Sequence, residues 1–506
     1  ADTTLPDRSC MVFSGTAVTR GHLTAVITAT GSASELGRIA DMITTAESGP
    51  TPLQERLTKL SKQLAVIVIA ACLIIFLAGV LREPFNSWNR RLIADMLLTA
   101  VSLAVAAIPE GLPAIVTVVL ALGSQRMAAH HAIVRRLSAV ETLGSVNVIC
   151  SDKTGTLTQN QMSVVDVLPA VQSDTEQNRH GLLAAAALCN DARIAPDGTP
   201  AGSATESALL TAAQAGGISV SEFQANWPRL KEIPFSSDRK RMSTLHRSAN
   251  GTHVLLVKGA AERILERVTA CGSLQADTLQ LQPGAQEYDA DFWVSRIEEL
   301  AATGKRVLAI AARSWNGSPN DLLSAENPES SLTLLGLMAL QDPVRPEARE
   351  AIRRCQSAGI QTVMITGDHA QTARAIAGDA GLLTAEGSVM SGQQLSELSD
   401  EELTRKLPTV NVFARVAPEH KLRIVKAFQA SGAVVAMTGD GVNDAPALAQ
   451  ANVGIAVGSG TDVAAETADI VLVNSNPKDI ANLILFGSAT YKKMMQNLWW
   501  AAGYNI

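Results

Sequence analysis

Three short apolar runs in the chain each end in a turn of small and polar residues. They are residues 146–150 (VNVIC), 361–365 (QTVMI) and 433–437 (AVVAM). Continuous apolar runs of about five residues are typical of buried strands in a parallel sheet. Helical patterns separate the later two runs, and a long insertion follows the first. The pattern predicts a doubly wound α/β domain, in which ligands bind beyond the carboxyl ends of the strands.

Two longer apolar segments predict a pair of transmembrane helices. Residues 64–81 carry no charge over 18 residues, and residues 96–125 carry only Glu110 over 30 residues. A helix rises about 1.5 Å per residue and a bilayer core is about 30 Å thick, so both segments can span it. The link at 82–91 is short, which predicts a hairpin in the lipid bilayer. Basic residues flank both sides of each span, so the charges do not settle its orientation.

The two ends of the chain show weaker patterns. Residues 12–18 and 23–28 are β-branched runs that predict short strands, and a helix follows them before residue 50. Residues 51–63 are amphipathic and lead into the first apolar segment. Residues 481–506 predict a helix that turns apolar near two tryptophans, residues suited to a membrane interface.

Composition changes this picture little. The 506 residues are too many for one core, so we expect several domains. A net charge of −6 offers no argument for nucleic-acid binding. The six cysteines form no CxxC pair, so the sequence suggests neither a thiolate metal site nor a disulfide framework.

The turn after the first run carries a candidate nucleophile. It reads SDKTGTLT from residue 151, and Asp152 stands at the strand's end. A carboxylate there can attack phosphorus, while Gly155 permits close backbone approach to phosphate oxygens. The later turns read TGD at 366–368 and TGDGVNDAP at 438–446. Together the three strings resemble the phosphorylation domain of P-type cation-transporting ATPases, which has a haloacid-dehalogenase-like fold.

The resemblance implies a role for each residue of these turns. Asp152 would accept the γ-phosphate of ATP as an aspartyl-phosphate, and Lys421, in APEHK, would neutralise the transferring group. Thr366 would donate a hydrogen bond to the phosphoryl oxygens. Many relatives of this fold carry a second aspartate where Thr154 stands, and its loss favours a long-lived pump intermediate over a simple phosphatase. The Mg²⁺ ligands implied are Asp152, Thr154, Asp440 and Asp444.

Residues 160–341 resemble the family's nucleotide-binding domain. KGAAE at 258–262 corresponds to the family's KGAPE, with Ala261 in place of proline. PFSSDRKRM at 234–242 resembles the segment whose phenylalanine stacks on adenine, with Ser237 where animal calcium pumps often have arginine. No GxxxxGK[ST] string is present, so ATP would be held by this separate domain. The nucleotide contacts implied are Glu206, Phe235, Lys240, Met242, Lys258, Arg306, Gly367 and Asp368.

Glu110 lies mid-segment in AAIPEGLP and marks a candidate ion site. An intramembrane carboxylate is costly and functional by default, and the neighbouring prolines and glycine free carbonyls for a hard cation. PEGLP resembles the calcium and calcium/manganese pumps, so Ca²⁺ or Mn²⁺ is expected as the transported cation. Residues 490–505 instead resemble the copper-type heavy-metal pumps, which keeps that alternative open. The further ligands implied are the carbonyls of Val105, Ala106 and Ile108, and Asn505.

The expected organisation follows from these matches. The chain lacks the family's TGE motif and is interpreted as a fragment of an integral membrane protein, in a prokaryotic plasma membrane, with its catalytic domains in the cytoplasm. ATP and Mg²⁺ are the expected cofactors, and no obligate protein partner is evident. A membrane-tethered phosphatase and a non-enzymatic ATP-binding module are the competing interpretations. The predicted parts are a partial actuator domain (1–50), a transmembrane hairpin (51–125), a divided phosphorylation domain (126–159 and 342–480), the inserted α+β nucleotide-binding domain (160–341) and a stalk with the start of the fifth membrane helix (481–506).

Overall fold

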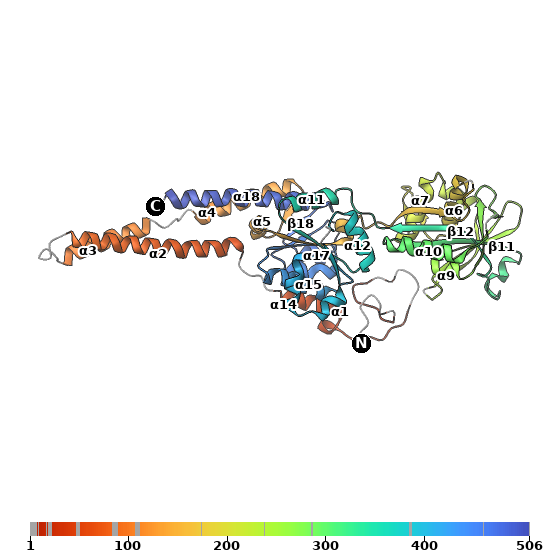
Figure 1. Cartoon of the computed structure of the whole chain (residues 1–506), viewed down its shortest axis with the longest axis horizontal. Coiled ribbons are helices and arrows are strands. Elements are labelled where there is room, and N and C mark those ends of the chain that lie inside the picture. Colours follow the sequence, from red (N-terminus) through yellow and green to blue (C-terminus); the bar gives the residue numbers. More distant parts are fainter. Residues whose placement is uncertain are drawn as a thin grey trace. The chain divides into compact units, whose positions relative to one another are not determined.

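The structure is a computed structural model of the chain (Figure 1). It describes residues 8, 10–16, 18, 23–46, 51–82, 90–106, 112–173, 175–236, 238–284, 287–383, 387–458 and 460–504. Its contacts divide the chain into two compact units. The first comprises Ala1–Leu157, Arg345–Asp368 and Asp379–Ile506, and the second comprises Thr158–Val344 and His369–Gly378.

The first unit is built on an eight-stranded sheet with the order β1-β18-β17-β16-β2-β13-β15-β14. All neighbours pair in parallel except β1 and β18. The three predicted strands are the central ones, β16, β2 and β13, and the predicted α/β class is confirmed. The strands are β1 Ala132–Val134, β2 Val148–Asp152, β13 Gln361–Ile365, β14 Ser388–Ser391, β15 Val410–Ala414, β16 Val435–Gly439, β17 Val453–Ala456 and β18 Ile470–Leu472.

Helices cover both faces of this sheet, as a doubly wound fold requires (Figure 1). Five helices pack their apolar side chains against Val148, Ile365 and Phe413 of the sheet and form one core. They are α13 Gly392–Glu397, α14 Asp400–Lys406, α15 Pro418–Ala430, α16 Ala445–Gln450 and α17 Asp462–Thr467. A second core forms on the other face around Ile149 and Ile455, with α5 Leu137–Leu143, α11 Ala348–Ser357 and α18 Pro477–Tyr504.

The second unit has a mixed eight-stranded sheet, in the order β10-β9-β12-β11-β8-β7-β6 with β3 paired to β12. The strands are β3 Ser163–Pro169, β6 Arg229–Ser236, β7 Arg241–Arg247, β8 His253–Ala260, β9 Val268–Gln275, β10 Gln280–Pro283, β11 Arg306–Trp315 and β12 Leu332–Gln341, beside the small pair β4 Arg193–Ile194 and β5 Pro200–Ala201. Helices α6 Thr175–Leu188, α7 Ala204–Ala215 and α8 Val220–Asn226 pack on one face. Helices α9 Ala261–Leu265 and α10 Ala290–Ala302 pack on the other. The helix α12 Ala370–Asp379 belongs to this unit up to Gly378.

The apolar segments near the N-terminus form helices α2 Pro52–Leu81, α3 Arg90–Ala106 and α4 Leu112–Ala129. Helices α2 and α3 lie side by side, and the Cys72 thiol donates a hydrogen bond to the Ala100 carbonyl at 3.2 Å. Within the described part of the chain, no helix combines the length and the apolarity that a membrane crossing needs. This finding corrects the prediction of two spans. Of the predicted second span, 96–125, the described parts lie in α3, up to Ala106, and in α4, from Leu112 on.

The two N-terminal strands predicted at 12–18 and 23–28 are also wrong for their described residues, which form turns and irregular chain. A strand needs a partner for its backbone groups, and no strand pairs with these residues in the described structure. Val26 and Ile27 are accordingly 86% and 81% exposed. The predicted helix is present as α1 Glu35–Thr44, and its N-cap Ser34 accepts a hydrogen bond from the Gly37 amide.

Candidate functional site

Asp152 is the last residue of the central strand β2. Parallel registry sets Asp152 beside Ile365 of β13, and sets Ser151 beside Thr438 of β16. The turns that follow these strands therefore open at the same edge of the sheet, where the order reverses and doubly wound folds place their ligands.

The turn Lys153–Leu157 follows Asp152, and the backbone conformation of Gly155 sets its shape. Gly155 has φ +68°, and a Cβ added there would lie 2.1 Å from Oδ2 of Asp440. Both the left-handed backbone and the close approach require glycine. The turn aims the amide of Thr154 at Oδ2 of Asp152, at 3.0 Å. Thr154 thus reaches the carboxylate through its backbone N–H.

A buried lysine lies between two carboxylates of the site. Lys421 stands in the first turn of α15, and its Nζ donates to Oδ1 of Asp152 at 2.6 Å and to Oδ1 of Asp444 at 2.5 Å. The three side chains are at most 10% exposed. Burial alone would lower the pKa of Lys421, but the two carboxylates raise it above its ordinary value. Lys421 therefore carries a fixed positive charge at the end of β2.

The carboxylates outnumber this one lysine. Oxygen atoms of Asp152, Asp440 and Asp444 all lie within 4.8 Å of one another. Burial raises the pKa of Asp152 to about 7, against the opposing effect of Lys421. Burial and the charge of Asp444 raise the pKa of Asp440 to about 6. A cluster of hard oxygens with excess negative charge fits Mg²⁺, and these three aspartates would hold it.

The remaining residues predicted for this site lie after β13. Thr366 is 2% exposed, and its hydroxyl accepts a hydrogen bond from the Asp368 amide at 3.1 Å. A side chain added at Gly367 would meet open space. The carboxylate of Asp368 pairs with Nζ of Lys153 at 3.0 Å, so in this structure it neutralises a buried lysine of the turn.

The residues predicted to contact nucleotide belong to the second unit, apart from the Gly367 and Asp368 turn. Lys258 on β8 lies in register with Met242 on β7, and both side chains are buried. Nζ of Lys258 pairs with Oε1 of Glu206 at 3.0 Å. Arg306 donates to the hydroxyl of Thr205, the neighbour of Glu206, at 3.3 Å. The structure thus brings together residues far apart in sequence.

Phe235 lies near the end of β6, and Lys240 lies in the turn between β6 and β7. The Phe235 side chain is 52% exposed, so it does not pack in the core. Lys240 is exposed and has φ +53°, and its carbonyl accepts a hydrogen bond from the Ala260 amide at 2.9 Å. An exposed phenylalanine at a turn is free to stack on a planar ligand.

Comparison with known proteins agrees with this arrangement. Residues 178–347 match the family described as "P-type ATPase, cytoplasmic domain N", and residues 3–44 match the "P-type ATPase actuator domain". The calcium-transporting ATPase of Bacillus subtilis (strain 168) is 41% identical over 536 residues, which cover 100% of this chain and 58% of that protein. The chain belongs to the P-type ATPase family.

Other P-type ATPases show the same extent of match. Calcium-transporting ATPase lmo0841 of Listeria monocytogenes is 42% identical over 506 residues, covering 98% of this chain and 57% of that protein. The chain thus spans less than two thirds of these relatives. A crystal structure of a zinc-transporting PIB-type ATPase superposes with a TM-score of 0.65 at 23% identity, over 95% of this chain and 62% of that one. That likeness supports the P-type ATPase fold, with its haloacid-dehalogenase-like domain and nucleotide-binding insertion.

The predicted ion site is only partly covered by the structure. Ile108, Glu110 and Asn505 lie outside the described residues. Val105 and Ala106 are the last two residues of α3, and the Val105 side chain is 55% exposed. The ligand set for the transported cation therefore stays a prediction.

Sequence reasoning missed one charged residue of this P-type ATPase site. Lys153 follows Asp152 directly, lies buried at 7% exposure and pairs with Asp368. The DKTGT string could have indicated Lys153, since a lysine beside a buried strand end needs a carboxylate partner. Cys150 is not a competing nucleophile, because burial raises the pKa of its thiol to about 12.

Gly155→Ala is expected to weaken Mg²⁺ binding at the aspartate cluster by about tenfold or more, since displaced supporting groups commonly cost that much affinity. The new Cβ would push the Asp440 carboxylate aside. Gly198→Ala is the matched control, because Gly198 also has positive φ but its added Cβ meets nothing within 4 Å. Titration calorimetry with Mg²⁺ decides, and equal affinities in the two variants would contradict this role of Gly155.

Proposed function

We propose that the chain is the catalytic part of an ATP-driven cation pump that stores the γ-phosphate of ATP as an aspartyl-phosphate on Asp152. The observation that carries this proposal is the buried contact of Asp152 with Lys421, beside Asp440 and Asp444. In the step proposed, an oxygen of Asp152 forms a bond to the γ-phosphorus as the bond to the bridging oxygen breaks, and ADP leaves.

The surroundings of Asp152 suit this transfer. Lys421 is positioned to offset charge on the moving phosphoryl group, and the Thr154 amide orients one carboxylate oxygen of Asp152 at 3.0 Å. The buried hydroxyl of Thr366 would donate to a phosphoryl oxygen. Mg²⁺ bound at Asp152, Asp440 and Asp444 would supply further positive charge.

ATP would reach this site from the second unit, where Phe235 stacks on adenine and Lys258, Glu206 and Arg306 complete the pocket. The phosphatase interpretation is disfavoured because Thr154 replaces the second aspartate and offers Asp152 a backbone N–H, which cannot act as a general base. The non-enzymatic interpretation is disfavoured because it gives no functional reason to bury the charged pair Asp152–Lys421, which is costly to bury.

The transported cation proposed is Ca²⁺ or Mn²⁺. The relatives named calcium-transporting ATPases support it, as does the hard-oxygen chemistry expected of Glu110 and freed carbonyls. We further propose that the whole protein resides in a bacterial plasma membrane with its catalytic domains in the cytoplasm. ATP, Mg²⁺, the transported cation and the lipid bilayer are the partners that this function needs.

Phe235→Ala is expected to weaken ATP binding by about 1–3 kcal/mol, the usual worth of an aromatic–base stack. Phe292→Ala is the matched control, because Phe292 is a similarly exposed phenylalanine on α10 in the same unit. Calorimetric titration with ATP in the absence of Mg²⁺ measures both. Unchanged affinity in Phe235→Ala would remove Phe235 from the nucleotide site.

The ion proposal predicts that the full-length protein forms phosphoenzyme from ATP only when Ca²⁺ or Mn²⁺ is present. Glu110→Gln should shift that dependence to higher metal concentrations without changing ATP affinity. Phosphoenzyme yield at buffered free concentrations of each metal is the measurement. Stimulation by Cu⁺ or Zn²⁺, with none by Ca²⁺ or Mn²⁺, would make the copper-type helix at 490–505 the better guide.

A further inference from the structure

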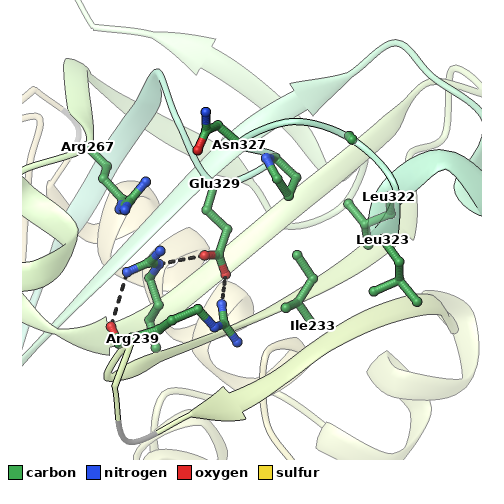
Figure 2. A pocket seen from close by; sticks show the side chains of 10 residues that line it. Ile233, Arg239, Arg267, Leu322, Leu323, Asn327 and Glu329 are labelled. Carbon is green, nitrogen blue, oxygen red and sulfur yellow. Dashed lines mark hydrogen bonds and ion pairs between the residues drawn. The ribbon is translucent and has the colours of Figure 1, made fainter.

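The second unit has a small cavity on the sheet face opposite Lys258 and Met242. Side chains alternate between faces along a strand, so Arg241 and Ser243 point away from Met242. The cavity has a volume of about 260 Å³. It is lined by Ile233, Arg239, Arg241, Arg267, Leu322, Leu323, Ala325, Asn327, Pro328 and Glu329, most of which Figure 2 labels.

One carboxylate organises two of the three arginines. Glu329 is 4% exposed, and its Oε1 accepts from Arg239 at 2.6 Å while its Oε2 accepts from Nε of Arg241 at 2.6 Å. The Ser243 hydroxyl also donates to Oε1, at 2.7 Å. Both oxygens of Glu329 are therefore occupied and hold these guanidinium groups in place.

The third arginine has no such partner. Nε of Arg267 is buried and finds no hydrogen-bond acceptor among the described residues. Figure 2 shows the Arg267 side chain pointing into the cavity from the side opposite Leu322 and Leu323. A buried donor without an acceptor is costly, so the site lacks a negative or acceptor group at this position.

The charge balance identifies the missing group. Arginine stays protonated in proteins, so three guanidinium groups face a single carboxylate and leave an excess of two positive charges. The opposite wall is apolar: Ile233 and the buried Leu322 line it, and Leu323 is 68% exposed at its edge. The volume lies below the range of drug-sized pockets, which begins at about 300 Å³.

We propose that this cavity binds a small organic anion that joins a phosphate or carboxylate group to a short apolar body. The anionic group pairs with the Arg267 guanidinium and offsets the excess positive charge, and the apolar body lies against Ile233, Leu322 and Leu323. The residues predicted to contact the nucleotide are not among those that line this cavity, and the proposal does not rest on the proposed pump function.

Ligand-observed NMR titration of the whole chain tests the site, with phenyl phosphate as the probe and inorganic phosphate and phenol as its two halves. Phenyl phosphate should bind more tightly than either half. Arg267→Gln should weaken phenyl phosphate by at least about tenfold, the usual cost of one charge-assisted hydrogen bond. Arg263→Gln is the matched control, because Arg263 lies on the neighbouring helix α9 and pairs outside the cavity with Glu266.

Leu323→Ser provides a second variant at an exposed position, where folding is not at risk. It should weaken phenyl phosphate by about threefold through the lost apolar contact and leave inorganic phosphate unchanged. Failure of phenyl phosphate to bind the wild-type chain would overturn the site. Equal affinity for phenyl phosphate in the wild-type chain, Arg267→Gln and Leu323→Ser would overturn it as well. Phenol that binds as tightly as phenyl phosphate would show that the cavity does not recognise the anionic group.

Discussion

Asp152→Asn is expected to abolish phosphoenzyme formation from ATP, with a loss of at least about 10³-fold in labelling rate. The amide keeps the shape of the carboxylate but cannot attack phosphorus. Acid quenching after incubation with γ-³²P-labelled ATP measures the label retained on the protein. Asp462→Asn, an exposed carboxylate in the first turn of α17, should label like the wild-type chain. Hydroxylamine-sensitive label on Asp152→Asn would refute the assignment of the nucleophile.

Asp152→Asn should also change how the unfolding free energy depends on pH. This measurement distinguishes a folded variant that lacks the nucleophile from one that fails to fold. The pKa of Asp152 is raised to about 7 and that of Asp440 to about 6, both above the ordinary 3.8. The folded state thus favours the protonated forms, and the stability this gives at low pH is lost as pH rises through 6 and 7. Without divalent cations, the unfolding free energy should fall across this window, and less steeply in Asp152→Asn. Urea unfolding at several pH values measures this free energy. If it fell equally steeply with pH in the wild-type chain and in Asp152→Asn, the charge cluster would be contradicted.

Lys421→Met is expected to have the second largest effect, on stability and on transfer together. Nζ of Lys421 contacts Asp152 at 2.6 Å and Asp444 at 2.5 Å, so its removal leaves two buried carboxylates facing each other. Breaking a buried pair of this kind costs about 3–5 kcal/mol. Phosphoenzyme formation should fall by about 10²–10³-fold, the usual loss for one preorganised electrostatic contact.

Two comparisons make the Lys421 prediction specific. Lys426→Met, at an exposed position on the same helix, should change neither stability nor labelling. The destabilisation in Lys421→Met should shrink as pH falls below about 6, because protonation then removes the charge that Lys421 had balanced. Urea unfolding at two pH values gives the result, and a destabilisation independent of pH would show that Lys421 acts through packing alone.

The sequence was most informative about the sheet that carries Asp152. The run 361–365 corresponds to β13, and the runs at 146–150 and 433–437 overlap β2 and β16, each of which begins two residues later than predicted. Both strands also end two residues later than predicted, because ladder pairing continues into the polar turns and makes Asp152 and Gly439 strand residues. Apolarity marks burial and does not report where a ladder ends.

Where the sequence failed, the missing information was long-range. The runs at 12–18 and 23–28 have strand composition, but strand formation depends on a partner that local pattern cannot reveal. Glu329 gave no local signal at all, because its partners Arg239 and Arg241 lie about 90 residues earlier in the chain. Conversely, the DKTGT and TGDGVNDAP strings predicted that Asp152, Asp440 and Asp444 share one edge of the sheet, since both follow strands, and the structure brings these three carboxylates together.

The central claim is that Asp152 accepts the γ-phosphate. Mapping the phosphorylated residue tests it most directly: the wild-type chain is incubated with ATP, Mg²⁺ and Ca²⁺, quenched in acid, reduced with borohydride and digested for mass spectrometry. Borohydride converts an aspartyl-phosphate to homoserine. The proposed function predicts homoserine at position 152 and nowhere else, and its absence when ATP is omitted. An unmodified Asp152 with ATP present, or homoserine at another aspartate, would contradict the proposal.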